Sequence, residues 1–200
     1  IRQISSAIPK ERQTLFFSAT MPPKIKSLAN SMLHDPVHVS IAPAAMTTPK
    51  IDQSLYHIPG EHKTALLKHL LEEDRVDRGV VFTKTKHGAD KLAKVLSRDG
   101  ITSAAIHGNR SQSQRERTLS AFRAGKFRVL VATDVAARGL DVDGITYVFN
   151  FNLPMEAEAY VHRIGRTGRA GATGRAISFC SREERGLLRD IERLTSKTID

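Results

Sequence analysis

The sequence predicts an α/β protein built on a doubly wound parallel sheet with helices on both faces. From about Ile51 onward, short β-branched runs alternate with segments of helical period, which is the pattern of repeated strand–helix–strand units. Two of the helical segments open with a capping-box pattern, Ser111-x-x-Gln114 and Ser181-x-x-Glu184. The chain has 200 residues, which is enough for one good core with an appendage.

Strands and helices are expected to alternate through this part of the chain. The strands are predicted at Gln53–Ile58, Gly79–Thr83, Thr102–Ile106, Arg128–Ala132, Thr146–Asn150 and Ala176–Cys180. The helices are predicted at Glu61–Asp74, Lys86–Asp99, Gln112–Ala124, Met155–Ile164 and Arg182–Leu194. Because ligands of open α/β sheets bind outside the carboxyl ends of the strands, we expect functional residues there.

The first part of the chain has a different pattern. A strand-like run at Thr14–Phe17, a helix opened by Pro22-Pro23 and a second strand at Val37–Ile41 precede a proline-containing linker at residues 42–50. Two strands and one helix bury too little surface to offset their own ordering entropy. We therefore expect residues 1–41 to be the end of another domain.

The charge of the chain predicts a polyanionic partner. The formal net charge is +10, and the segment from His107 to Arg128 holds six Lys or Arg against one acid, Glu116. We interpret this segment as a binding face. With no Trp and 6% aromatic residues, base stacking is not expected, so a nucleic acid would be held by its backbone with little sequence preference.

Composition also excludes several classes of protein. A single cysteine, Cys180, lies in an apolar stretch and cannot form an internal disulfide, so we expect a buried thiol. The eight histidines show no paired metal-ligand spacing, and no metal site is assigned to this chain. Without a signal-peptide pattern or an 18-residue apolar run, the protein is expected to be cytoplasmic and to have no membrane partner.

Short motifs occur in a fixed order along the chain: Ser18-Ala19-Thr20, the run ATDVAARGLD at Ala132–Asp141, and HRIGRTGR at His162–Arg169. They resemble motifs III, V and VI of the DEAD-box ATP-dependent RNA helicases. Val80–Thr83 resembles motif IV, and His107-Gly108 followed by Gln112-x-x-Arg115 resembles the RNA-contacting element of that family. The resemblance covers essentially the whole chain and, between the motifs, is greatest to the bacterial RhlE-type subgroup.

This resemblance implies a domain organisation. Residues 51–200 would form the C-terminal RecA-like domain, and residues 1–41 the end of a first RecA-like, ATP-binding domain, joined by the linker at 42–50.

The resemblance implies that Arg166 and Arg169 are arginine fingers that bind ATP and stabilise the charge on its γ-phosphoryl oxygens. Arginine suits this task because its planar fork pairs with phosphate and keeps its proton. His162 would act with them and couple the site to motif III through Ser18 and Thr20. The alternative is a basic, glycine-punctuated surface loop with a packing histidine.

A second set of residues is implied to hold the ribose and RNA. Asp141 and Gly139 would belong to the ATP site, where Asp141 would bind the ribose. The alternative is that Asp134 merely caps a short helix and that Gly139 makes a turn. The helix that begins near Gln112 exposes amide donors, which favour phosphate. The residues implied to contact RNA are Thr83, Lys84, Gly108, Gln112, Arg115, Thr133 and Arg138.

The sequence contains neither a G-x-x-x-x-G-K-[ST] loop nor Asp-Glu-Ala-Asp, which hold ATP phosphates and Mg²⁺. The first RecA-like domain would therefore hold the Mg²⁺, and this fragment alone should not hydrolyse ATP. The expected function is that of the second domain of an ATP-dependent RNA helicase, with RNA, ATP and the first domain as partners. The alternative is a non-catalytic RNA-binding or partner-docking module, against which the retention of Arg166 and Arg169 argues.

Overall fold

The computed structural model describes residues 2–9, 11–18, 21, 23–40, 51–137, 142–169 and 171–199. The chain divides into two compact units, residues 1–46 and residues 47–200. None of the helices in these described ranges is both long and apolar enough to span a membrane.

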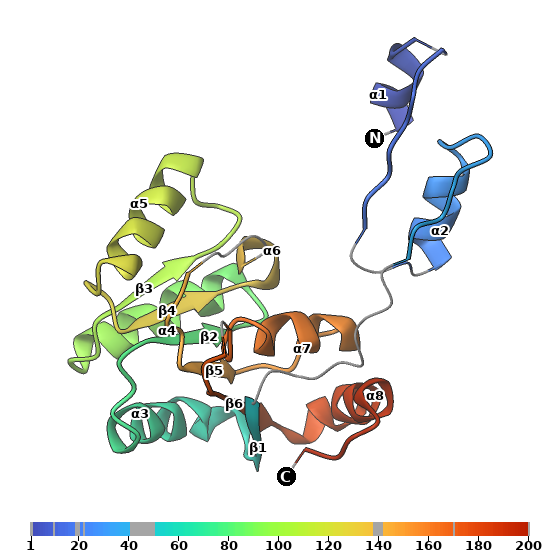
Figure 1. Cartoon of the computed structure of the whole chain (residues 1–200). Helices are drawn as coiled ribbons and strands as arrows, with labels where there is room; N and C mark the ends of the chain where they lie inside the picture. Colours follow the sequence, from blue (N-terminus) through green and yellow to red (C-terminus); the bar gives the residue numbers. More distant parts are fainter. Residues whose placement is uncertain are drawn as a thin grey trace. The chain divides into compact units, whose positions relative to one another are not determined.

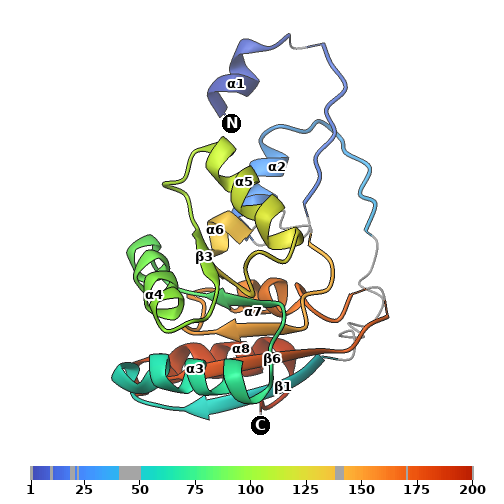
Figure 2. The same ribbon diagram turned by 90° about the vertical axis from the view of Figure 1, so that its left-hand side faces the viewer.

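The larger unit is built on a six-stranded sheet in the order β1-β6-β5-β2-β4-β3, in which every pairing is parallel. All six strands lie where the sequence predicts them, within a few residues at each end, so the predicted fold class is confirmed. Figure 2 shows β1 and β3 at opposite ends of this order. The strands are β1 (Ile51–His57), β2 (Gly79–Phe82), β3 (Ser103–Ile106), β4 (Val129–Ala132), β5 (Tyr147–Asn150) and β6 (Gly174–Cys180).

Helices cover both faces of this sheet (Figure 1). Two short 3₁₀ turns, η1 (Gly60–His62) and η2 (Arg182–Glu184), lead into α3 and α8. The predicted helices are therefore confirmed, although two of them begin with a 3₁₀ turn. The α-helices of this unit are α3 (Lys63–Glu73), α4 (Lys86–Arg98), α5 (Gln112–Arg123), α6 (Asp134–Ala137), α7 (Ala157–Ile164) and α8 (Arg185–Thr195).

Alternation along the central strands decides which helices pack on which face. Val81 packs in the same cluster as the apolar residues of α3 and α4. Its neighbour Val80 packs with α5 and α6 on the opposite face, because successive side chains of a strand point to opposite sides. A third cluster packs α7 and α8 against β6 through Ala176 and Cys180. Cys180 is buried as expected, and burial raises the pKa of its thiol.

Both capping boxes are present. At the start of α5, Ser111 N–H donates to Gln114 Oε1 over 3.1 Å, and Gln114 N–H donates to Ser111 Oγ over 3.3 Å. At η2, the Glu184 carboxylate accepts a 3.0 Å hydrogen bond from Ser181 N–H. Glu184 also accepts from Lys63, which is 2% exposed. Lys63 Nζ also donates to the Phe151 carbonyl, so this one residue fastens the start of α3 to the segments that follow β5 and β6.

The smaller unit contains α1 (Arg2–Ala7), which was not predicted, and α2 (Pro23–Asn30), which was. The strands predicted at Thr14–Phe17 and Val37–Ile41 are wrong for the described residues 14–17 and 37–40, which form no strand. A strand needs a partner for its backbone groups, and the described part of this unit offers none. The linker at residues 42–50 lies outside the described residues.

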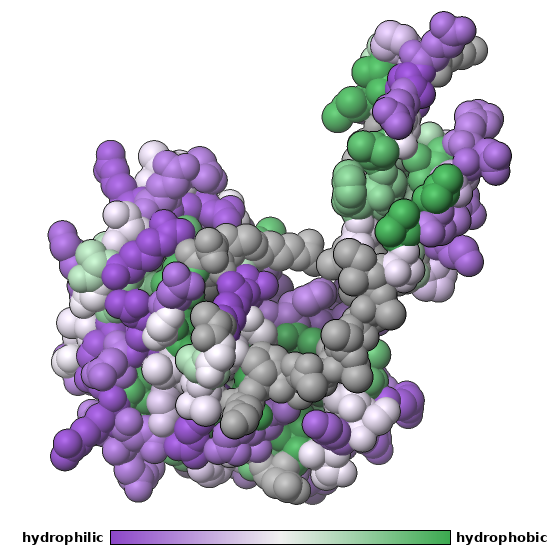
Figure 3. All heavy atoms as spheres, in the orientation of Figure 1, coloured by the Kyte–Doolittle hydropathy of each residue, from purple (hydrophilic) through white to green (hydrophobic). Residues whose placement is uncertain are grey.

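Large apolar side chains of the smaller unit are exposed, and Figure 3 shows apolar surface (green) over it. The exposed fractions are 87% for Phe17, 90% for Val37 and 85% for Val39. Single exposed apolar residues are common, but several on so short a segment are unusual for a folded unit.

Candidate functional site

Three of the predicted site residues of the larger unit lie at one edge of the sheet. Thr83 follows β2, Gly108 follows β3 and Thr133 follows β4. These three strands are neighbours in the order β2-β4-β3, and their carboxyl ends meet at the same edge because they are parallel. Residues from three separate motifs are thus brought together by the sheet.

Arg163, on α7, is the buried centre of this edge, with 2% of the residue exposed. Its Nε and Nη2 donate to the two carboxylate oxygens of Asp134 over 2.6 and 2.8 Å. Its Nη1 donates to Asn150 Oδ1 over 3.1 Å and to the Asn152 carbonyl over 2.6 Å. The guanidinium also lies over the Phe82 ring, 5.0 Å from the centroid. Side chains and backbone from β2, β5, α6 and α7 are therefore joined through one residue.

Arg163 is not among the residues predicted for the site from the sequence. A signal for it was present, because Tyr160 and Ile164 define the buried face of α7 and Arg163 lies between them on that face. A charged residue at a core-facing helical position requires a buried partner. That requirement indicates an acid elsewhere, but it does not say which one.

Asp134 was interpreted as a helix cap, and this interpretation is wrong. Asp134 is the first residue of α6, and the N–H groups of Ala136 and Ala137 donate to the carbonyl of Thr133 instead. Both carboxylate oxygens of Asp134 accept from Arg163. The residue therefore holds α7 against α6.

The two predicted finger arginines follow α7 in a loop. Helix α7 ends at Ile164, so His162 lies on the helix and Arg166 lies beyond its end. Arg166 Nε donates to the His162 carbonyl over 3.2 Å, and Arg169 Nε donates to the Gly165 carbonyl over 2.8 Å. Both arginines are half-buried and His162 is exposed. Each guanidinium is thereby oriented by the main chain.

The shape of this loop depends on Gly174 and Gly168. Gly168 adopts a left-handed backbone with φ +67°, which glycine tolerates best. A Cβ on Gly174 would lie 2.2 Å from Thr167 Oγ1 and 2.7 Å from Gly168 N. The Thr167 hydroxyl is buried and donates to the Ile145 carbonyl. The loop is thus pressed against the first residue of β6.

The predicted RNA-contacting residues differ in how they are placed. Lys84 is exposed, whereas Thr83 is 2% exposed and its hydroxyl donates to the Thr85 carbonyl over 3.3 Å. Gln112, at the exposed start of α5, donates to Glu116 over 2.9 Å. Arg115 Nη2 donates to the Ala136 carbonyl over 3.2 Å, which ties α5 to α6.

The basic segment from His107 to Arg128 is not one binding face. Arg110 Nη2 donates to Asp90 over 2.7 Å, on the side of α4. Arg128 donates to the carbonyls of Val76 and Leu71, at the end of α3. Both partners belong to helices on one face of the sheet, whereas α5, which carries Arg115, Arg117 and Arg123, packs on the opposite face. The charge counted along the segment is therefore not gathered on one surface.

His107 and Asp90 form a pair at the end of β3. His107 is 3% exposed, and its Nε2 lies 3.0 Å from Asp90 Oδ2 without the geometry of a hydrogen bond. Burial acts to raise the pKa of Asp90, but the His107 ring and the Arg110 guanidinium outweigh it, and the pKa lies below its ordinary value. Among the described residues, no three His, Cys, Asp or Glu side chains form a group that could hold a metal ion.

Thr20, Arg138, Gly139 and Asp141 lie outside the described residues. Ser18 is described and exposed in the smaller unit.

Comparison with known proteins agrees with this fold. Residues 62–171 match the family described as helicase conserved C-terminal domain. The whole chain is 44% identical to the DEAD-box ATP-dependent RNA helicase CshA of Bacillus subtilis and to that of Geobacillus kaustophilus. It spans 40% and 43% of their lengths, so the chain corresponds to about two fifths of these relatives. These relatives do not confirm the predicted RhlE-type subgroup.

Solved structures show the same similarity. The chain is 40% identical to Escherichia coli DEAD-box protein SrmB bound to regulator of ribonuclease activity A, with a TM-score of 0.72 over 75% of this chain and 89% of that one. Against Saccharomyces cerevisiae Dbp5 bound to RNA and ADP BeF3, the identity is 28% and the TM-score 0.85, over 96% and 51% of the two chains. In sequence and in fold, the chain belongs to the family of helicase conserved C-terminal domains found in DEAD-box proteins.

Proposed function

We propose that this chain acts as the second RecA-like domain of an ATP-dependent RNA helicase, which supplies arginine fingers and an RNA backbone grip. The observation that carries the proposal is the convergence of motifs IV, V and VI at one edge of the parallel sheet, held together by Arg163 and Asp134. The loop that carries Arg166 and Arg169 lies next to the proposed RNA-binding edge. Coupling of ATP binding to RNA binding requires the two sites to be neighbours in this way.

Arg166 and Arg169 are the proposed fingers. Their Nε atoms are held by main-chain carbonyls, so each guanidinium is oriented before a triphosphate arrives. Such a finger typically contributes a factor of about 10³–10⁵ to the rate of hydrolysis. His162, which is exposed beside them, is proposed to couple this loop to Ser18 and Thr20 of the smaller unit.

The residues proposed to face the RNA backbone are Lys84, Gly108, Gln112 and Arg115, together with the amide groups at the start of α5. Thr83 is buried, and the Thr133 carbonyl accepts the first hydrogen bonds of α6. We propose that these two residues contribute to RNA binding indirectly, by shaping the loops that contact the RNA. Arg138 is proposed to complete the grip. Asp141, with Gly139, is proposed to bind the ribose of ATP.

Residues 1–41 are proposed to be the end of the first RecA-like domain, with residues 42–50 as the linker and 51–200 as the second domain. The exposed Phe17, Val37 and Val39 support this, since a sheet of that first domain would cover them. The first domain would also hold the ATP phosphates and Mg²⁺. The chain alone is therefore expected to hydrolyse no ATP.

In the whole protein, ATP and RNA binding would close the two domains on each other. We propose that closure bends one RNA strand against the second domain and separates a short duplex locally, in the cytoplasm. The names of relatives agree with this: CshA of Bacillus subtilis is named an ATP-dependent RNA helicase, and the Dbp5 structure contains RNA and ADP BeF3.

The test is RNA-stimulated ATP hydrolysis by a protein that joins this chain to a first RecA-like domain. Arg169→Ala should lower turnover at least about 10³-fold, because the lost guanidinium stabilises charge formed only in the transition state. Arg189→Ala, an exposed change on α8, is the matched control and should leave turnover unchanged.

If Arg169→Ala left RNA-stimulated turnover unchanged, the finger assignment would be wrong. If the joined wild-type protein bound RNA but hydrolysed no ATP, the non-catalytic RNA-binding module would be the better description.

A further inference from the structure

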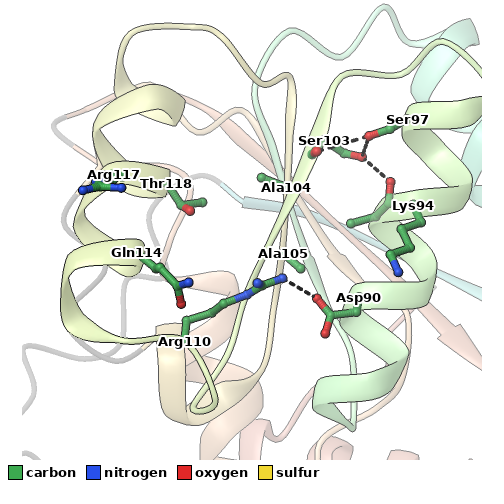
Figure 4. Close-up of a pocket in the computed structure, with 11 residues that line it drawn as sticks. Asp90, Lys94, Ser97, Ser103, Ala104, Ala105, Arg110, Gln114, Arg117 and Thr118 are labelled. Carbon is green, nitrogen blue, oxygen red and sulfur yellow. Dashed lines mark hydrogen bonds and ion pairs between the residues drawn. The ribbon is translucent and has the colours of Figure 1, made fainter.

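A groove of about 540 Å³ lies along the free edge of the sheet. Among the strands that the structure describes, β3 ends the order and has β4 as its single neighbour. Helix α4 covers one face of the sheet and α5 the other, so the two helices form the walls and β3 forms the floor, as Figure 4 shows. We propose that this groove binds an extended, acidic polypeptide segment of a partner protein, which adds as a strand beside β3.

The backbone of β3 is arranged for such pairing. The carbonyls of Thr102 and Ile106 accept from the strand at β4, through Arg128 N–H over 2.9 Å and Thr133 N–H over 3.3 Å. Because alternate residues of a parallel strand pair with opposite neighbours, Ser103 and Ala105 turn their backbone groups toward the groove.

At one end of this free edge, the backbone carbonyl already has a hydrogen-bond donor. The Ser103 carbonyl accepts from Ser97 Oγ over 3.2 Å, and the two hydroxyls lie 3.0 Å apart, so α4 closes the groove at its amino end. At the other end, Arg110 reaches across to Asp90 of α4 (Figure 4). Ala105 lies between these two closures and is the position at which an added strand would pair.

The floor of the groove is open. Ala104 and Ala105 are the side chains of β3 between the closures, and both are small. Free edges are commonly protected by proline, a bulge or an inward charge, and β3 carries none of these. The volume falls within the roughly 300–1,000 Å³ of binding pockets. An added strand would lie about 4.8 Å from β3.

The charged side chains that line the groove indicate which kind of partner it binds. The lining contains three cations, Lys94, Arg110 and Arg117, and one acid, Asp90. Asp90 already faces Arg110 at 2.7 Å and His107 at 3.0 Å. The groove therefore attracts an acidic segment. A single-stranded nucleic acid fits less well, because none of the described residues that line the groove is aromatic, and the main-chain groups of β3 that face the groove match those of a peptide.

The experiment selects, from a displayed library of random dodecapeptides, those that bind the whole chain. Peptides that also bind the Ala105→Pro variant are removed in a subtraction step. Proline removes the N–H that faces the groove and is tolerated on edge strands. The expected result is enrichment of acidic peptides with alternating β-branched residues, which bind Ala105→Pro at least about tenfold more weakly. Failure to enrich any peptide relative to the variant would overturn the proposal.

Two charge-reversal variants test the groove without relying on the folding of the Ala105→Pro variant. Lys94→Glu in the groove should weaken the selected peptides several-fold, whereas Lys91→Glu, exposed on the same helix but outside the lining, should not. Equal effects of the two changes would overturn the assignment. Oligouridine should not compete with the peptides, and full competition would show a general polyanion site instead.

Discussion

Arg163 and Asp134 form a bidentate ion pair, with Nε 2.6 Å from Oδ1 and Nη2 2.8 Å from Oδ2. The pair joins α7 to α6 across the carboxyl edge of the sheet. Because Arg163 comes just before the loop that carries Arg166 and Arg169, its position sets where that loop begins. The ion pair thus connects the proposed RNA-binding and finger segments.

Arg163→Met should lower the free energy of unfolding by about 2–3 kcal/mol, because it leaves the Asp134 carboxylate unpaired. The effect is below that of a fully buried pair, since the Asp134 side chain is 38% exposed. Urea unfolding of the chain measures it. Arg193→Met breaks an exposed pair with Asp190 and serves as the control, with stability expected to be nearly unchanged. Equal effects of the two substitutions would contradict a structural role for Arg163.

Gly174→Ala should destabilise the chain by about 1–3 kcal/mol, because its methyl group would overlap Thr167 and Gly168. The motif VI loop should shift with it, visible as amide chemical-shift changes from residue 165 to 169. Gly186→Ala is the matched control, since its Cβ meets nothing within 4 Å and it lies in α8. That change should be neutral or stabilise by up to about 1 kcal/mol. The idea fails if Gly174→Ala is as well tolerated as Gly186→Ala.

Glu184 should make stability depend on pH in the acid range. Burial acts to raise its pKa, but the hydrogen bonds from Lys63 and the Ser181 backbone outweigh it, so the folded pKa lies below the ordinary value of 4.5. A carboxylate with a lowered folded pKa stabilises the fold above its ordinary pKa, and this stability is lost as pH falls through the folded value.

Urea unfolding between about pH 7 and pH 3 tests this. Glu184→Gln should be less stable than the wild type at pH 7, and the difference should shrink as the pH falls below 4.5. Glu158→Gln, an exposed change on α7, is the control. A constant difference between Glu184→Gln and wild type across the range would rule out the linkage.

Lys84→Ala should weaken the binding of single-stranded RNA by the chain uniformly across sequences. It should also reduce the slope of log K against log salt by about 0.7, the value for one lost phosphate contact on a single strand. Fluorescence anisotropy with oligouridine and a mixed-sequence strand at several salt concentrations measures both quantities. Lys91→Ala is the control on α4. An unchanged slope for Lys84→Ala would remove it from the RNA grip.

Local sequence patterns predicted the larger unit well. The capping box at Ser111 and Gln114 marked the start of α5, because the hydrogen bonds of a cap join residues three apart. The same reasoning failed for the run at Thr14–Phe17, which has strand-like composition but no described partner strand. A strand is stabilised by its neighbours in the sheet, so its sequence alone does not decide whether it forms.

By itself, the sequence determined the succession of strands and helices and the carboxyl-edge location of the motifs, since periodicity, caps and parallel strands are local or general properties. The tertiary structure decided which side chains meet there. Arg163 finds Asp134 at a separation of 29 residues and Asn150 at 13, and only the strand order β5-β2-β4 brings those positions together. It also divided the basic segment between two faces and left β3 with an open edge, because pairing in a sheet is set by contacts between residues distant in sequence.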